Sequence, residues 1–125
     1  MEWVIVALQL VIALGILNVW LLRFGKATDW RGGGARNMRE EFAVYGLPPW
    51  FMYTVGFFKI LFAGLLIAGV YWRWLTPWAA AGMGVLMLGA VAMHLKVKDP
   101  PKKALPSFTL LVLCGVVAVA GYAVV

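Results

Sequence analysis

The 125-residue sequence has one cysteine, Cys114, and one histidine, His94. A lone cysteine excludes a disulfide within the chain and a multi-cysteine metal site. A lone histidine excludes bis-histidine haem ligation within the chain, and there is no Cys/His cluster of the kind that binds zinc. The sequence also offers no Ser–His–Asp arrangement and no paired carboxylates inside an apolar stretch. We therefore expect no catalytic residues, no metal site and, on balance, no enzyme.

Charged residues are scarce as well, at 13% of the chain, whereas 64% of the residues are hydrophobic and the mean hydropathy is +0.90. Soluble domains are usually about 25% charged and about 45–50% apolar. A water-soluble fold of this length leaves too much surface exposed to hide so many apolar side chains. The composition excludes a disordered chain, a coiled coil and an ordinary cytosolic enzyme, and it indicates a membrane protein.

Four apolar stretches are each long enough to cross a bilayer as a helix, which takes about 20 residues. The first is expected to be retained, because Glu2 stands where a signal peptide carries its basic region and no A-x-A cleavage site follows. We predict an all-α membrane protein, a single domain over residues 1–125 built as a four-helix transmembrane bundle. The predicted helices cover about residues 3–22, 50–72, 74–95 and 104–125.

The connection after the first stretch contains a short amphipathic segment at about residues 35–45. Met38, Phe42 and Tyr45 fall at i, i+4 and i+7 on one face, and the opposite side carries basic residues. A helix of this kind tends to lie in the membrane interface. The preceding run Gly32–Gly34 is interpreted as a flexible linker in preference to a phosphate cradle, since no strand precedes it and no GK[ST] ending follows.

Positive charge is confined almost entirely to the connections between the apolar stretches. Nine of the ten loop cations lie in the first and third connections, and the tenth, Arg73, lies in the second. The positive-inside rule therefore predicts basic loops in the cytoplasm and both termini outside, in the cell (inner) membrane. Nucleic-acid binding is excluded because no water-exposed module fits. Contact with anionic lipid headgroups is expected instead, from Arg31, Arg36, Arg39, Lys102 and Lys103.

Large aromatic residues fall near the predicted helix ends, where such rings settle at the level of the lipid headgroups. We interpret them as interfacial anchors rather than as residues that stack on a ligand. They are Trp3, Trp20, Trp50, Tyr71, Trp72, Trp74 and Trp78.

Lys59 is the one cation that falls well inside a predicted helix. It lies nine residues past Trp50, or roughly 13 Å into the layer at about 1.5 Å per residue. An uncompensated lysine there costs about 2.5–3.5 kcal/mol on insertion scales, so we predict a ligand-binding or polar cluster around it. In the alternative, Lys59 snorkels partway to a water or a carbonyl. The predicted cluster consists of Lys59, Asn18, His94 and one of Glu40 or Glu41.

Several short motifs occur in a recognisable order around the predicted second and third helices. They are FAVYGLPPW at 42–50, GFFK at 56–59, Gly64, and His94 followed by Asp99-Pro100. Over about residues 22–119 these motifs resemble the DoxX-like family. The resemblance implies a four-helix integral membrane bundle. Many members of that family carry Glu where this chain has Lys59, so a role that depends on that carboxylate does not transfer.

The resemblance implies two kinds of function, because the family includes an archaeal thiosulfate:quinone oxidoreductase subunit, bacterial proteins of oxidative-stress complexes and an animal branch that assists receptor assembly. The first is a non-catalytic partner or assembly factor for membrane proteins, working with the lipid bilayer and with a homo-oligomer or a larger membrane protein. The alternative is an accessory subunit of a quinone-linked oxidoreductase or stress-response redox complex.

No cofactor is expected beyond the quinone or lipid-like ligand that such an accessory subunit would bind. A filled core would favour the partner role, and a polar-lined cavity between the helices would favour the ligand-binding subunit. A small multidrug transporter is set aside, because that class depends on a membrane-embedded Glu in its first helix, where this chain has Gln9 and Asn18.

Overall fold

The computed structural model describes residues 2–26 and 32–124, and every regular element within these ranges is helical. Four of the helices are long and apolar enough to span a membrane. The candidate spans are Trp3–Leu22, Pro49–Ala68, Leu75–Lys96 and Pro101–Ala120. The predicted fold class, a four-helix transmembrane bundle, is therefore confirmed, and the chain is a multi-pass membrane protein.

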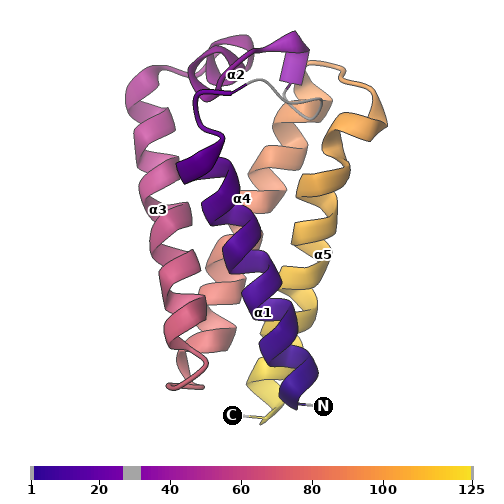
Figure 1. The fold of residues 1–125 in the computed structure, drawn as a ribbon. Coiled ribbons are helices and arrows are strands. Elements are labelled where there is room, and N and C mark those ends of the chain that lie inside the picture. Colours follow the sequence, from indigo (N-terminus) through magenta and orange to yellow (C-terminus); the bar gives the residue numbers. More distant parts are fainter. Residues whose placement is uncertain (1, 27–31, 125) are drawn as a thin grey trace.

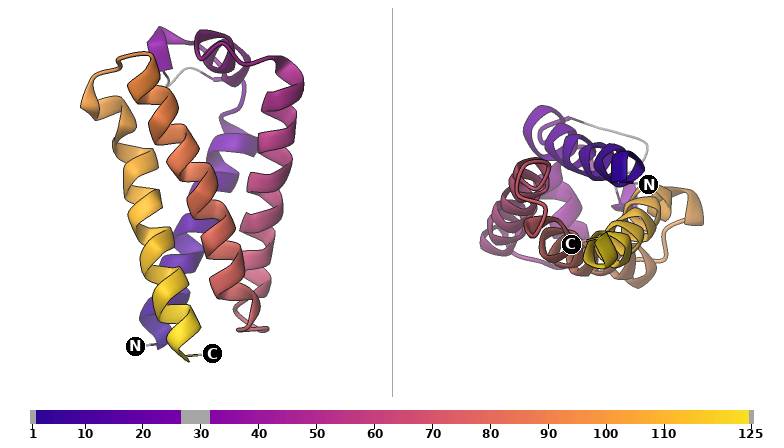
Figure 2. Two further views of the ribbon diagram at one scale, coloured as in Figure 1. Left: turned by 180° about the vertical axis from the view of Figure 1, so that it is seen from behind. Right: turned by 90° about the horizontal axis from the view of Figure 1, so that it is seen from below.

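The long helices form a ring in which neighbours in the chain are also neighbours in space (Figures 1 and 2). Helix α1 (Glu2–Leu17) packs against α3 (Pro49–Ala68) and α5 (Pro101–Val124). Helix α4 (Leu75–Lys96) completes the ring between α3 and α5. Helix α1 begins and α5 ends at one end of the bundle, and the short helix α2 (Met38–Val44) lies across the other, which we call the α2 end.

Proline residues set the start of two of the long helices. Pro49 occupies the first turn of α3, where its missing N–H leaves no intrahelical bond unmade. Helix α5 begins at Pro101, three residues before the predicted start at Ala104, for the same reason. The turn before it includes Lys98, which adopts a left-handed φ of 57° and ends α4 by reversing the chain.

Helix α2 corresponds to the predicted amphipathic segment, but it is shorter than residues 35–45. Asn37 caps it by accepting a hydrogen bond from the Glu40 backbone N–H at 2.8 Å, which fixes its start. Its apolar face is buried, with Met38 at 4% and Phe42 at 8% exposure. The face that was expected to lie in the membrane interface therefore packs onto the bundle and closes the α2 end.

The glycine run before α2 is an ordered turn rather than the flexible linker that was expected. Gly32–Gly34 forms one turn of 3₁₀-helix, and Gly33 adopts a left-handed φ of 60° that suits glycine. The Gly32 N–H donates to Glu41 Oε2 at 3.1 Å, and the Gly33 N–H donates to Asp99 Oδ1 at 3.0 Å. The backbone N–H groups that were considered for a phosphate thus hold two carboxylates of the chain itself.

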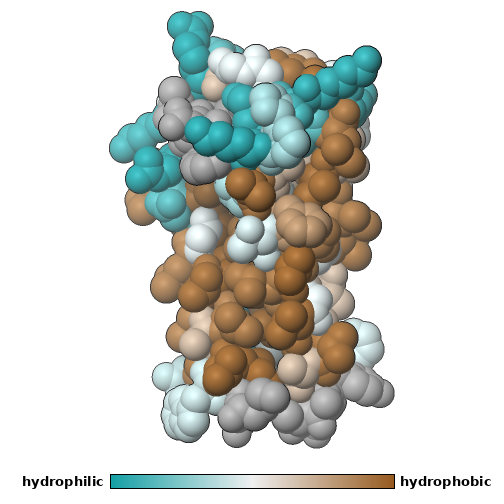
Figure 3. Space-filling model, turned by 90° about the vertical axis from the view of Figure 1, so that its right-hand side faces the viewer, coloured by the Kyte–Doolittle hydropathy of each residue, from teal (hydrophilic) through white to brown (hydrophobic). Residues whose placement is uncertain are grey.

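The surface of the bundle separates into bands along its axis. Hydrophilic residues gather at the α2 end, and a hydrophobic belt covers the spanning helices below it (Figure 3). Six of the seven predicted aromatic anchors are exposed, as expected. The exception is Trp20, which is 6% exposed and belongs to the core.

Candidate functional site

A cavity of about 660 Å³ lies inside the bundle at the α2 end. Residues from all five helices line it, and most of them are apolar. Polar groups gather within it as well. They include Asn18, Glu41, Tyr45, Lys59, His94 and Lys103.

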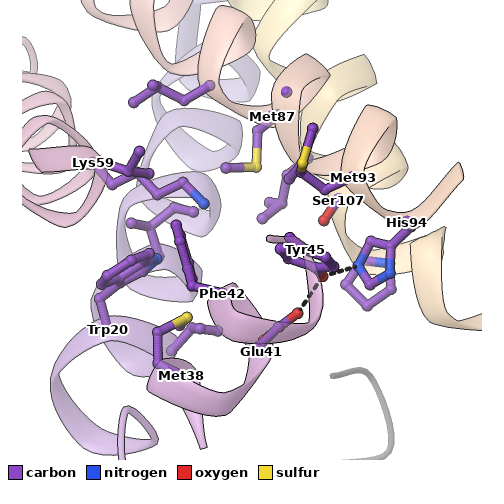
Figure 4. Close-up of a pocket in the computed structure, with 18 of the residues that line it drawn as sticks. Trp20, Met38, Glu41, Phe42, Tyr45, Lys59, Met87, Met93, His94 and Ser107 are labelled. Atoms are coloured by element: carbon purple, nitrogen blue, oxygen red, sulfur yellow. Dashed lines mark hydrogen bonds between the residues drawn. The ribbon is translucent and has the colours of Figure 1, made fainter. Parts of the chain in front are cut away.

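Lys59 points into this cavity from α3 (Figure 4). It lies on the buried face of the helix, one turn from Gly56 and from Ala63, and its exposed fraction is 9%. Its Nζ lies 5.2 Å from the centroid of the Trp20 ring, a cation–π contact. Within the part of the chain that the structure describes, Nζ makes no hydrogen bond and no ion pair. Within the described residues Nζ therefore reaches no carbonyl, and the alternative of a lysine that snorkels partway to a water stays a prediction.

Two local features carry the Trp20 ring to Lys59. Helix α1 widens into a π-helical turn over Asn18–Leu22, an arrangement that often accompanies functional sites. Opposite the ring, α3 has Gly56, and a Cβ at that position would lie 2.6 Å from Trp20 Cζ3. The motif GFFK thus places the glycine that admits the indole one turn before the lysine that the indole covers.

A series of hydrogen-bonding groups runs along the cavity wall from α2 to the end of α4 (Figure 4). The Tyr45 hydroxyl donates to Glu41 Oε2 at 2.6 Å and lies 3.5 Å from His94 Nε2. His94 Nδ1 lies 2.7 Å from Asp99 Oδ2, and both side chains are 5% exposed. Because an ionised carboxylate has no proton to donate, Nδ1 carries the proton of this bond.

Asp99 is held in its ionised form by the groups around it. Burial alone would raise the pKa of Asp99, but the Gly33 N–H, the His94 ring and the charge of Lys103 together lower that pKa below its ordinary value of 3.8. The left-handed turn at Lys98 brings the carboxylate back over the end of α4. Asp99 is therefore more than the helix-connecting turn residue that its place before two prolines predicts.

The structure brings together most of the predicted polar cluster. Asn18, Glu41, Lys59 and His94 all line the cavity. Asn18, Glu41 and His94 lie around an open volume, and none of these three side chains bonds directly to Lys59. The prediction that they form a binding site is not tested by this placement and stays a prediction.

Glu40 is the cluster candidate that does not line the cavity. Its Oε1 accepts a hydrogen bond from the Arg36 backbone N–H at 3.1 Å and lies 3.5 Å from Arg36 Nε. The backbone bond is the main reason why the pKa of Glu40 is lowered from its ordinary value of 4.5. Glu40 thus stabilises the start of α2, and Glu41 is the acidic residue that reaches the site.

The five cations predicted to contact lipid headgroups differ in their surroundings. Arg36 and Lys102 are exposed, and Arg39 Nη2 donates to the Tyr53 hydroxyl at 3.1 Å. Lys103 is half-buried and lines the cavity. Arg31 lies outside the described residues. Headgroup binding by these residues stays a prediction.

Sequence reasoning missed Trp20, Tyr45 and Asp99 as parts of the site. It also missed a second polar cluster at the opposite end of the bundle. There the fully buried Gln9 donates from Nε2 to the Leu66 carbonyl at 2.6 Å, and its Oε1 accepts from Arg73 Nη1 at 2.8 Å. A glutamine inside an apolar helix was the available signal, because such a group is buried in lipid only with a partner.

The arrangement at the α2 end can hold an amphipathic molecule. Lys59 and the polar wall, which consists of Glu41, Tyr45 and His94, offer hydrogen-bonding groups and charge. The remaining lining is mostly apolar. Among known proteins, a family model described as the DoxX-like family matches residues 24–119. No curated protein and no solved structure matches the chain. The matched region contains the whole of α2, α3 and α4 and most of the cavity lining, and the chain belongs to the DoxX-like family.

Proposed function

We propose that this protein binds a lipid-like molecule in the cavity at the α2 end. The observation that carries the proposal is Lys59, whose ammonium is buried, points into a cavity of about 660 Å³ and makes no hydrogen bond within the described residues. Burying a cation at this depth costs about 2.5–3.5 kcal/mol on insertion scales. A ligand that satisfies the ammonium accounts for a lysine at this position.

The shape of the site supports a ligand that comes from the membrane. Phe51 on α3 and Val85 and Gly89 on α4 line the cavity and are also exposed at the surface. These two helices diverge toward the α2 end (Figure 2). The cavity therefore opens between them on a face that lipid covers, and an amphiphile can enter without leaving the bilayer.

A cavity of this kind favours the ligand-binding alternative over the purely structural partner, for which a filled core was expected. A quinone is one candidate ligand, because its carbonyl oxygens accept hydrogen bonds from groups such as Lys59 Nζ. With a quinone as its ligand, the protein would serve as an accessory membrane subunit of a quinone-linked or stress-response redox complex. A role as an assembly factor, alone or as a homo-oligomer, stays a prediction.

We further propose that the protein lies in the cell (inner) membrane with its α2 end in the cytoplasm and both chain ends outside. The support is the distribution of charge. Arg36, Arg39, Lys102 and Lys103 lie at the α2 end, and Arg73 lies at the opposite end. This asymmetry is the one that the positive-inside rule relates to orientation.

The proposed function is tested by native mass spectrometry of the full chain purified in a neutral detergent from its native membrane. A bound lipid-like molecule is expected with the wild-type protein. Ala90→Trp, which fills the cavity from α4, should abolish it, and the matched variant Ala92→Trp, exposed on the same helix, should retain it. A wild-type protein without any bound molecule, or an Ala90→Trp variant that still binds it, would contradict the proposal.

A further inference from the structure

We infer that the ligand of the cavity is an amphiphile with an anionic headgroup, a carboxylate or a phosphate, and that Lys59 is its counter-ion. The inference rests on the proposed function, because it specifies the chemistry of the molecule that the same cavity holds. The Lys59 side chain is 9% exposed, and its ammonium points into the cavity (Figure 4). A buried ammonium is best stabilised by an anion that reaches it and accepts its hydrogen bonds.

The cation–π contact with Trp20 leaves the N–H donors of Lys59 unused. The Trp20 ring covers one side of the ammonium at 5.2 Å from the ring centroid. A cation–π contact of this kind provides electrostatic attraction but no hydrogen-bond acceptor in the ordinary sense. An ammonium has three N–H donors, so donors remain for a molecule in the cavity.

The acidic side chain in the cavity lining does not take the place of an anionic ligand at Lys59. Arg23, Lys59 and Lys103 are positive, and Glu41 is the acidic residue among the described lining residues. The charge of Glu41 does act on Lys59, but Glu41 Oε2 already accepts the Tyr45 hydroxyl at 2.6 Å. The acidic side chain of the lining is thus already engaged, and within the described residues Lys59 Nζ pairs with no carboxylate.

The apolar part of the lining specifies the rest of the ligand. Val85, Leu86 and Met87 lie near the middle of α4, and Ile16 and Leu110 line the same cavity from α1 and α5. These side chains offer hydrocarbon contact on the part of the site that lies nearer the centre of the bundle. A headgroup at Lys59 would leave an acyl chain free to occupy this region and to leave through the opening between α3 and α4.

The inference is tested by comparing three ligands that carry the same long hydrocarbon chain and differ in headgroup charge, together with a short-chain quinone. Native mass spectrometry of the full chain in a neutral detergent measures occupancy with oleate, with oleoyl lysophosphatidic acid, with oleyl alcohol and with a short-chain quinone. At equal concentrations, one or both anions should bind at least tenfold more tightly than the alcohol and the quinone. The two anionic arms distinguish a carboxylate from a phosphate headgroup.

The matched variants assign any selectivity to the cavity. Lys59→Met should reduce the preference for the anion over the alcohol at least tenfold, and Lys59→Arg should keep that preference. Lys102→Met removes an equal charge from an exposed position outside the cavity, so it should also keep the preference. Equal binding of all four ligands by the wild-type protein, or undiminished selectivity in Lys59→Met, would overturn the inference while leaving the proposed function in place. The absence of any binding, both of the added ligands and of molecules carried over from the native membrane, would overturn both. Should Lys59→Met fail to fold, the comparison of ligands on the wild-type protein and on Lys59→Arg still decides.

Discussion

His94 and Asp99 form a buried pair in which Nδ1 and Oδ2 are 2.7 Å apart, and the pair joins the end of α4 to the turn that follows it. The second carboxylate oxygen of Asp99 accepts the Gly33 N–H at 3.0 Å. One side chain thus orients the imidazole at the cavity and holds the glycine turn beside α2. With Nδ1 committed to Asp99, the other ring nitrogen of His94 faces Tyr45.

Asp99→Asn should destabilise the protein and change its response to acid. An amide presents one oxygen where the carboxylate presents two, so a bond to His94 or Gly33 is lost, which costs about 1.5–3 kcal/mol for a hydrogen bond to a charged group. The pKa of Asp99 is lowered in the folded protein, so its contribution to stability is full above pH 3.8 and is lost as the pH falls through the lowered pKa. Thermal unfolding in detergent between about pH 2 and pH 6 measures both effects.

Glu40→Gln is the matched control for this prediction. Glu40 also has a lowered pKa, but its contact with Arg36 is exposed to water. Exposed ion pairs contribute little to stability, so Glu40→Gln should have the smaller effect. Equal unfolding temperatures for the two variants across this pH range would show that the buried pair contributes nothing.

The spans were predictable because crossing a bilayer needs about 20 apolar residues, and stretches of that length are plain in the sequence. The face of each helix that points into the bundle was not predictable from the sequence. A helix in lipid is apolar on both faces, so the periodicity that marks the buried face of a soluble helix is lost. Lys59 was the exception, because a cation in the middle of a span must point away from lipid.

The rest of the site depends on backbone geometry that the sequence does not display. Trp20 has the usual position of an interfacial anchor, and only the π-helical turn together with Gly56 explains why it is buried. Asp99 has the usual position of a turn residue before proline. Its contact with His94 depends on the left-handed backbone at Lys98, a conformation that a lysine does not signal.

Gly56→Ala should destabilise the bundle by about 1–3 kcal/mol, the usual effect of adding volume to a packed core. The new Cβ would lie 2.6 Å from Trp20 Cζ3 and 2.8 Å from Cε3, so the buried indole must move away from Lys59. Thermal unfolding in detergent measures the loss. Gly64→Ala, on the same helix with nothing within 4 Å of the added atom, should leave the stability unchanged or raise it. Equal losses in both variants would mean that helix flexibility, rather than the Trp20 contact, requires glycine.

The proposed orientation predicts opposite reactivity for two single cysteines placed at the two ends of the bundle. Both variants are made in a Cys114→Ser background. Arg36→Cys places a thiol at the α2 end, where the native arginine side chain is 81% exposed. Trp72→Cys places a thiol just after the end of α3, where the native tryptophan is 60% exposed. If the α2 end is cytoplasmic, a membrane-impermeant maleimide should label Trp72→Cys in intact cells and Arg36→Cys only after the membrane is opened. The reverse pattern would show that the charge asymmetry does not set the orientation, and the polar wall of the cavity would then lie toward the outside of the cell.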